Sequence, residues 1–378
     1  MARYRGTMTL APPIVEQDSD WQSGRLPDLH LCNNYRHVMM SLATIAHVGR
    51  PAVVIYLEDL LPMPADMRMR LALACPLATF LFTHDASQMQ TFARLPRFLP
   101  AIMRRNLTLG GRFGITTPRN WRMPLLKGQQ FATGYVYHAG FFTSKVVAAS
   151  CARMVLREDG LNNYARLSVP PLKAVLRALS GLSPRHQIWG EERWIDAIEV
   201  SHPAHLPASV RSKARALTFS DVMDILPAQT ARNIASAFCA DLPKIGRVGA
   251  RTAILLTQPI DDIGICTFAD KQALYAQIAA HLTAKGYRVT IKPHPREVAI
   301  ALPNVTNLPP AFPVEAWPYI TDQKFSLAVA LCSAALVSGA RAFADQTTQL
   351  VPAAMFNVDH FAKWPGVIAP ALAKALQA

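Results

Sequence analysis

Residues 28–60 read DLHLCNNYRHVMMSLATIAHVGRPAVVIYLEDL. Two short apolar runs, Leu29–Cys32 and Ala52–Leu57, lie near the two ends of this stretch. Strands that are apolar without alternation are typical of a parallel sheet whose two faces are both covered. We therefore expect each run to be a buried strand of such a sheet.

The segment between the two runs carries the signals of a helix. Asn33 and Asn34 suit an N-cap, and Gly49 stands where the helix should end. Apolar residues recur there at helical spacing: Val38, Met39, Leu42, Ile45 and Ala46. A strand, a helix and a strand in this order predict a βαβ unit.

Similar units recur along the chain, whose 378 residues fit two domains better than one. A further helix is expected over residues 268–285, ending at Gly286, and the mixed stretch 201–226 is expected to lead into a linker. Further strands are predicted at Thr79–Thr83, Gly134–Tyr137, Met154–Arg157, Ala253–Thr257, Tyr287–Lys292, Val305–Leu308 and Leu327–Leu331. The pattern predicts an α/β protein of two doubly wound domains facing a cleft, and ligands of such sheets bind at the carboxyl ends of the strands.

The composition excludes several classes of protein. Half of the residues are apolar and 17% are charged, which indicates a packed globular chain. The six cysteines are scattered without a C-x-x-C pair, which argues against zinc ribbons and redox motifs and favours free thiols in a reducing cytoplasm. No signal peptide or membrane-spanning run is apparent, and no D-x-D, G-x-G-x-x-G or P-loop motif is present.

The net charge of +14 is concentrated in one segment. No acidic residue occurs between Asp85 and Glu158, whereas the segment contains eleven basic residues: Arg94, Arg97, Arg104, Arg105, Arg112, Arg119, Arg122, Lys127, Lys145, Arg153 and Arg157. A field of one sign attracts a polyanion or an anionic membrane. The alternative is compositional drift in a basic protein.

A histidine between two prolines follows one predicted strand, in the stretch VTIKPHPRE at residues 289–297. The prolines fix the backbone and remove two amide donors, so His294 is held on a stiff loop at a strand end. Its imidazole could donate to a phosphate or share a proton with it, and Lys292 and Arg296 add positive charge nearby. The alternative is a turn with a satisfied structural histidine.

Two more strand ends carry polar groups that suit a nucleotide. Glu315, which follows a proline-rich turn, could accept both hydroxyls of a ribose, or could simply favour a helix N-terminus. Cys332 and Ser333 precede an expected helix start, where a hydroxyl and backbone amides can bind an anion, or where the serine is only an N-cap. Together with His294, these residues predict a phosphate and ribose site on one sheet.

An acidic pair, Glu158-Asp159, ends the acid-free segment and is followed by Gly160. Gly160 permits a tight turn, so the carboxylates can project from a strand end. One member of such a pair can act as a base while the other orients it. The alternative is an ordinary surface turn, and the sequence does not distinguish which carboxylate would be the base.

These motifs resemble those of bacterial sialyltransferases of the GT-B fold. That family has a D/E-D/E-G motif, an HP motif and an S-S/T motif, which here read Glu158-Asp159-Gly160, His294-Pro295 and Cys332-Ser333. The contexts LLTQP, KPHPRE and FPVE look most like the bacterial polysialyltransferases, and the similarity extends from LHLCNN to CSAAL. The departure is Cys332, because a thiol is a poorer donor than the serine often found there.

The resemblance implies the roles of particular residues. The donor would be CMP-sialic acid, and the enzyme would invert the anomeric centre without a metal or a cofactor. Glu158, helped by Asp159, would deprotonate the acceptor, and His294 would stabilise the departing CMP. The donor site would comprise Gln258, Lys292, His294, Pro295, Glu315, Cys332, Ser333 and Ala334. The acceptor would be a sialylated glycan, and the reaction would elongate polysialic acid. This anionic acceptor would contact Asn33, Asn34, Arg104, Arg105, Arg112, Arg119, Arg122 and Lys127.

The expected domains are residues 1–225 for the acceptor and the base, and residues 226–355 for the donor. Residues 356–378 would form a terminal helical segment that could return to the first domain. We expect a cytoplasmic protein, and its basic face allows peripheral attachment to the anionic inner face of the membrane. Alternatives are a mono-sialyltransferase of lipooligosaccharide, a transferase of another CMP-activated acid sugar, a non-hydrolysing epimerase and a basic nucleic-acid-binding protein. Nucleic acid is the least expected partner, because no DNA- or RNA-binding motif is visible.

The basic segment yields a first prediction. Reversing the charge at Arg104, Arg105 and Arg112 should weaken binding of long anionic acceptors more than that of short ones, because a polyanion gains from each additional cation. Transfer rates on acceptors of defined length would measure the difference. An equal loss on short and long acceptors would contradict a polyanion-binding role.

Overall fold

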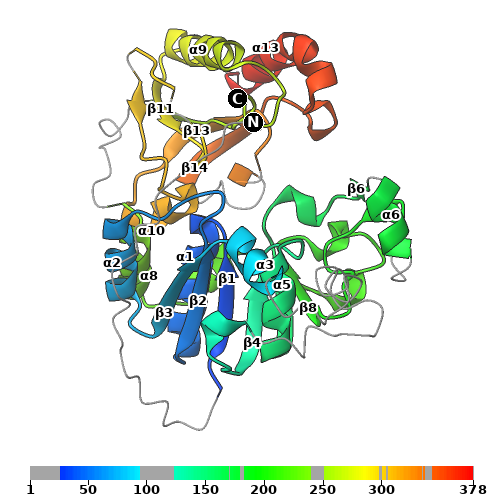
Figure 1. Ribbon diagram of the computed structural model, residues 1–378. Coiled ribbons are helices and arrows are strands. Elements are labelled where there is room, and N and C mark those ends of the chain that lie inside the picture. Colours follow the sequence, from blue (N-terminus) through cyan, green and yellow to red (C-terminus); the bar gives the residue numbers. More distant parts are fainter. Residues whose placement is uncertain are drawn as a thin grey trace.

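The computed structural model describes residues 26–93, 123–169, 171–178, 183–239, 251–297, 300–303, 305–333, 335–336 and 343–377. It contains two parallel sheets in separate domains, one above the other in Figure 1. A two-stranded antiparallel ribbon, β6 (Leu167–Ser168) with β7 (His186–Gln187), is attached to the first domain.

The first sheet has the strand order β3-β2-β1-β4-β5-β8-β9, and every neighbouring pair is parallel. The chain moves outward in one direction from β1 through β2 and then in the other from β4, so the switch point lies between β1 and β4. The strands are β1 (Asp28–Cys32), β2 (Ala52–Leu57), β3 (Ala78–Thr83), β4 (Phe131–Val136), β5 (Cys151–Arg157), β8 (Ala197–Val200) and β9 (Ala214–Ala216).

The predicted βαβ unit is confirmed, and its capping is as expected. The Asn34 side chain accepts a hydrogen bond from the His37 backbone N–H, which starts α1 (Tyr35–Val48) directly after β1. Gly49 ends α1 with φ of 66°, a left-handed conformation that glycine adopts without strain. The other helices of this domain are α2 (Ala65–Ala74), α3 (Asp85–Ala93), α5 (Phe142–Val147), α6 (Pro171–Ala178), α7 (Phe219–Met223) and α8 (Ala228–Ser236).

The second sheet has the order β12-β11-β10-β13-β14 and is also parallel throughout. Its switch point lies between β10 and β13, again at the centre of the sheet. The elements are β10 (Thr252–Leu256), α9 (Phe268–Ala284), β11 (Arg288–Lys292), β12 (Thr306–Asn307), α10 (Trp317–Ile320), β13 (Phe325–Ala330), β14 (Ala344–Gln349) and α13 (Trp364–Ala375).

Two boundaries differ from expectation. The stretch 201–226 does not simply lead into a linker, because it adds β9 to the edge of the first sheet and contains α7. The helix α8 packs on α1 and α2 of the first domain and on α10 of the second, so it lies at the junction of the two domains. The terminal segment does not return to the first domain: α13 lies with the second domain in Figure 1, and its Trp364, Ile368 and Leu372 are buried in the core of that domain.

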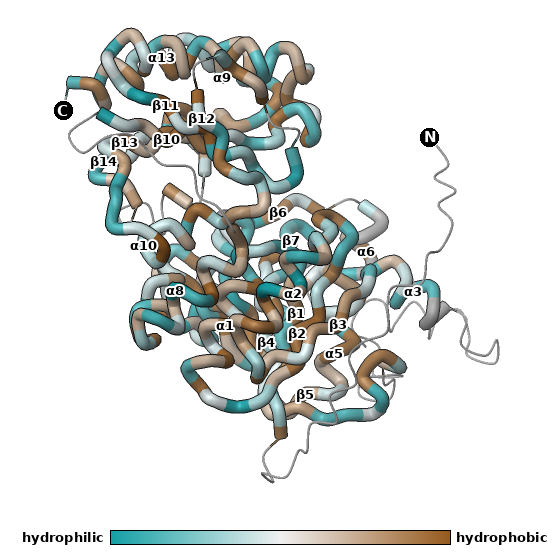
Figure 2. The backbone as a smooth tube through the Cα atoms, turned by 90° about the vertical axis from the view of Figure 1, so that its left-hand side faces the viewer, coloured by the Kyte–Doolittle hydropathy of each residue, from teal (hydrophilic) through white to brown (hydrophobic). Residues whose placement is uncertain are grey.

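The two domains share one apolar core. Side chains of α1 and α8 join one face of the second sheet and α10 in a single cluster, which includes Phe238 from the first domain and Trp317 and Phe325 from the second. The other faces of the two sheets have their own clusters. The hydrophobic stretches of the tube in Figure 2 accordingly lie mainly inside each domain and along α1. In the described part of the chain, no helix combines the length and the apolar character that crossing a membrane requires.

Candidate active site

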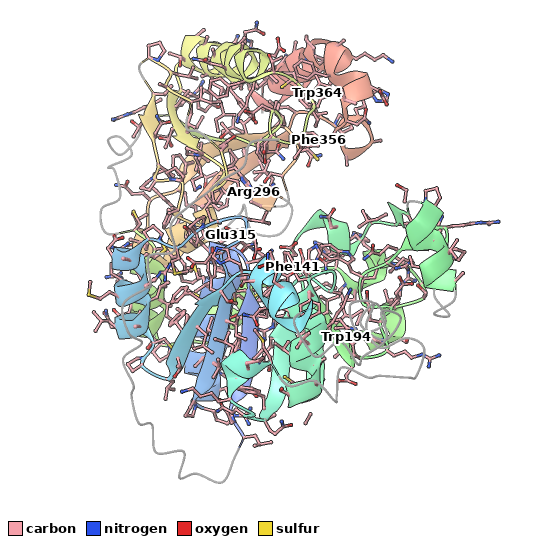
Figure 3. The ribbon with its side chains drawn as sticks, viewed as in Figure 1. Phe141, Trp194, Arg296, Glu315, Phe356 and Trp364 are labelled. Carbon is pink, nitrogen blue, oxygen red and sulfur yellow. The ribbon has the colours of Figure 1, made fainter. Side chains whose placement is uncertain are left out.

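A cavity of about 590 Å³ lies between the two domains, a size that suits a small-molecule ligand. It is lined by residues that follow the carboxyl ends of strands in both sheets, as the doubly wound topology predicts. Figure 3 shows Arg296 and Glu315 of the second domain and Phe141 of the first gathered where the domains meet. Of the predicted residues, Asn33, Asn34, Asp159, Lys292, His294, Pro295, Glu315 and Ser333 line this cavity.

His294 is held on the loop after β11 by two hydrogen bonds. Its backbone N–H donates to the Glu297 carboxylate (2.6 Å), and its Nδ1 accepts from the Arg296 backbone N–H (3.2 Å). The acceptor role of Nδ1 places the proton of the neutral ring on Nε2. Burial, followed by the charges of Arg296 and Lys292, lowers the pKa of His294 to about 4. At pH 7 the imidazole is therefore a neutral hydrogen-bond donor.

Glu297 anchors this loop from behind, and the sequence analysis did not identify it. Its carboxylate accepts a hydrogen bond from the Thr257 hydroxyl and pairs with the Lys271 ammonium (2.7 Å), with both charged side chains almost fully buried. Lys271 also pairs with Asp261 (2.8 Å). Burial lowers the pKa of Lys271, but the two carboxylates raise it more. The histidine loop is thus fixed to α9 by a buried ion-pair network.

Lys292, the last residue of β11, is buried beside the cavity. Its ammonium donates to the carbonyl oxygens of Pro293 and Pro310, the latter at 3.1 Å. Burial lowers the pKa of Lys292 to about 8, although Glu315 and Glu297 act in the opposite direction. The group therefore remains mostly charged at pH 7 and supplies a fixed cation next to the histidine loop.

Only some of the described residues predicted around the serine motif line the cavity, and the others support it from outside. Gln258 donates to the backbone carbonyl of Cys332 and accepts from its N–H (2.8 Å), so both polar atoms of the amide join the ends of β10 and β13. Neither Gln258 nor the buried Cys332 lines the cavity, whereas Ser333 does. Gln258 thus shapes the predicted donor site from outside it. Ala334 lies outside the described residues.

The two carboxylates of the acidic pair occupy different environments. The Glu158 carboxylate is buried, accepting from the Ser201 backbone N–H (2.5 Å) and the Tyr164 hydroxyl (2.8 Å). It does not line the cavity. The Asp159 carboxylate does, and it lies 2.8 Å from His37 Nε2. Of the two, only Asp159 is therefore placed to meet a substrate in this cavity.

His37 supports Asp159 from the first turn of α1. Its ring is fully buried and stacks on Tyr137, with 3.9 Å between the ring centroids. Burial lowers the pKa of His37 more than Asp159 raises it, so a neutral ring donates its Nε2 proton to the carboxylate. Burial raises the pKa of Asp159, but His37, His138 and Arg36 lower it more, and the carboxylate stays ionised.

Among the described residues, only two of those predicted to bind the acceptor line the cavity. Asn33 and Asn34 line the cavity, and the Asn34 amide also approaches Asp159 (3.4 Å). Lys127 precedes β4 and so lies at the amino-terminal edge of the first sheet; it does not line this cavity, and its contact with the acceptor stays a prediction. Arg104, Arg105, Arg112, Arg119 and Arg122 lie outside the described residues.

Several cavity residues were not predicted from the sequence. These are Arg36, His138 and Phe141; Arg296, whose charge was expected beside His294, lines the cavity as well. Arg36 is the clearest omission, because it stands two residues after Asn34 and thus in the first turn of a helix that begins at a strand end. Among the described residues, no cluster of three or more His, Cys, Asp or Glu side chains is arranged to hold a metal ion.

Two Rossmann-like domains whose strand ends face one cavity constitute the GT-B architecture of glycosyltransferases, as expected from the sequence. The model of the alpha-2,8-polysialyltransferase (POLYST) family matches residues 131–352 of this chain. The chain belongs to this family. It is a glycosyltransferase of the sialyltransferase class.

Comparison with solved structures gives weak global matches. The GT-B domain of a sialyltransferase from Photobacterium damselae aligns with a TM-score of 0.42 and 11% identity, covering 92% of this chain and 97% of that one. An alpha,alpha-trehalose-phosphate synthase (UDP-forming) from Burkholderia vietnamiensis gives 0.38 and 9%, covering 93% and 91%. The apo structure of OtsA gives 0.37 and 8%, covering 91% and 96%. No curated protein sequence matches the chain significantly.

The buried network behind the histidine loop yields a stability prediction. Lys271→Met should lower the free energy of unfolding by about 3–5 kcal/mol, because it leaves Glu297 as an uncompensated buried charge. Chemical denaturation would measure the loss. The matched control is Lys285→Met at the exposed end of the same helix, which should change stability by less than about 0.5 kcal/mol. Equal effects of the two variants would contradict the network.

Proposed function

We propose that this enzyme transfers sialic acid from CMP-sialic acid to a hydroxyl group of a sialylated glycan, by direct displacement with inversion. The observation that carries the proposal is the position of Asp159 and His294, which line one cavity from opposite domains. Direct displacement needs a base on one face of the sugar and a leaving-group site on the other. Membership of the polysialyltransferase family supports a sialyl donor.

His294 serves the leaving group in this proposal. The Nε2–H group of the neutral ring donates a hydrogen bond to a phosphate oxygen of CMP. Lys292 adds a positive charge and Ser333 a hydroxyl on the same side of the cavity. A nearby phosphate raises the pKa of an imidazole, so His294 can hold a proton on the phosphate as the glycosidic bond breaks. Glu315 accepts hydrogen bonds from the ribose hydroxyls. These groups supply the charge stabilisation without a metal or cofactor.

Asp159 serves the acceptor as general base. Its ionised carboxylate accepts the proton of the attacking hydroxyl, while His37 and Asn34 hold it in place. Glu158 is assigned a supporting role, because its bonds to Ser201 and Tyr164 fix the turn that presents Asp159. This assignment reverses the order of the two carboxylates that the family resemblance implies; the sequence itself leaves the base undecided.

Repeated transfer would extend a polysialic acid chain, and the basic segment at residues 94–122 is proposed to attract that polyanion. The protein is proposed to act in the cytoplasm, at the inner face of the membrane. Single transfer to lipooligosaccharide is the second candidate, because one donor and one acceptor hydroxyl at this cavity serve single and repeated transfer alike. The length of the product on an acceptor of defined length separates the two.

The roles of the acidic pair can be separated by mutation. Asp159→Asn should lower kcat by about 10²–10⁴-fold, the contribution typical of a general base. Glu158→Gln retains an acceptor oxygen for Ser201 and Tyr164 and should lower kcat by less than about tenfold. His294→Ala should cost about 10²-fold, as loss of one donor to a charged leaving group does. Release of CMP from CMP-sialic acid with a sialylated acceptor measures all three. A larger loss in Glu158→Gln than in Asp159→Asn would overturn the assignment.

The His37 contact predicts a shift in the pH profile. His37→Leu removes a hydrogen bond that lowers the pKa of Asp159, so that pKa should rise. Because a base must be ionised to act, activity is lost as the pH falls through its pKa, and the acid limb of kcat/KM should move to higher pH. His37→Gln, which can still donate, should restore part of the limb. If His37→Leu lowered kcat/KM equally at every pH and left its acid limb in place, the role of His37 would be purely structural.

A further inference from the structure

Arg36 connects the two domains at the centre of the cavity. Its Nη1 donates to the backbone carbonyl of Glu158 (3.1 Å), and its Nε lies 3.2 Å from the Glu315 carboxylate of the second domain. Both side chains of this ion pair are largely buried, at 16% and 10% exposed. Among the described residues that line the cavity, Arg36 is the single arginine or lysine that the first domain contributes.

The proposed donor competes with this ion pair. If Glu315 accepts the ribose hydroxyls, its carboxylate is drawn away from Arg36, at least in part. A guanidinium that loses its carboxylate in a partly buried cleft is destabilised until another anion replaces it. The hydrogen bond from Arg36 Nη1 to the Glu158 carbonyl holds the guanidinium at the turn that carries Asp159. The guanidinium therefore cannot move far with the Glu315 carboxylate.

We propose that Arg36 binds the carboxylate of the transferred sugar, and that Glu315 occupies this carboxylate subsite in the empty enzyme. The inference rests on the proposed function and adds the residue that selects an acidic sugar. Because Nη1 is engaged with Glu158, the Nε and Nη2 edge faces the second domain, and this edge can bind a carboxylate through two parallel hydrogen bonds.

The chemistry of the donor places its carboxylate near Arg36. In a 2-keto acid sugar, the carboxylate is attached to the anomeric carbon, which is the atom that the acceptor hydroxyl attacks. A group that binds this carboxylate must therefore lie beside the anomeric carbon, between the base on one side and the phosphate site on the other. Arg36 is fixed to the turn that carries Asp159, and His294 and Lys292 lie on the other domain.

Binding of CMP and of CMP-sialic acid to Arg36→Met, measured calorimetrically without acceptor, tests the exchange. CMP-sialic acid should bind about tenfold to hundredfold more weakly, because charged hydrogen bonds to its carboxylate are lost. CMP should bind as well as to the wild type or better, because Glu315 no longer has a competing partner. Arg36→Lys, which keeps the charge but not the paired geometry, should fall between the wild type and Arg36→Met for CMP-sialic acid.

The matched control is Arg50→Met, which removes a different arginine–carboxylate pair (3.0 Å to Asp28) of the first domain and should leave both affinities unchanged. Equal weakening of CMP and CMP-sialic acid by Arg36→Met would show a structural role and overturn the inference. If Arg36→Met bound CMP and CMP-sialic acid more tightly by the same factor, the Arg36–Glu315 pair would only hold the two domains together. That result would also overturn the inference. Wild-type enzyme that binds neither ligand would instead overturn the proposed function, and the inference with it.

Discussion

The apolar core that continues from the first domain into the second is the constraint on which the site depends. Phe238 after α8 and Trp317 of α10 belong to the same buried cluster as the inner face of β10 and β13. This contact sets the orientation of the two sheets, so that their carboxyl edges face one cavity. The polar groups of the candidate site lie on loops that leave those edges and on the first turn of α1. Disruption of the shared core would therefore separate Asp159 from His294 without touching either residue.

The proposed phosphate site is lined by basic groups of the second domain. His294 and Lys292 are buried, and both have pKa values lowered chiefly by that burial. The two pKa shifts have different consequences, because at pH 7 the His294 imidazole is a neutral donor whereas the Lys292 ammonium stays mostly charged. Glu297 and Lys271 maintain this arrangement from behind the loop. A negatively charged ligand would thus enter a site that is polarised before it binds.

Local signals in the sequence predicted much of the fold. The Asn34 cap and Gly49 defined α1, and apolar runs identified the central strands, because these features depend only on neighbouring residues. Contacts between distant parts of the chain were not predictable in this way. The Arg36–Glu315 pair joins different domains, and Glu297 acquires its role only through Lys271 of α9. The sequence likewise could not place Lys127, whose distance from the cavity follows from the direction of β4.

The different roles proposed for the two members of the acidic pair follow from the partners of each side chain. Glu158 and Asp159 directly follow β5, and their carboxylates point to different partners. Glu158 is bound by Ser201, which follows the neighbouring β8, and by Tyr164, whereas Asp159 turns toward α1 and His37. The residue that is buried holds the turn rigid, and the residue that lines the cavity remains ionised. Two adjacent carboxylates are thereby kept from sharing one environment, in which one of them would have to take up a proton.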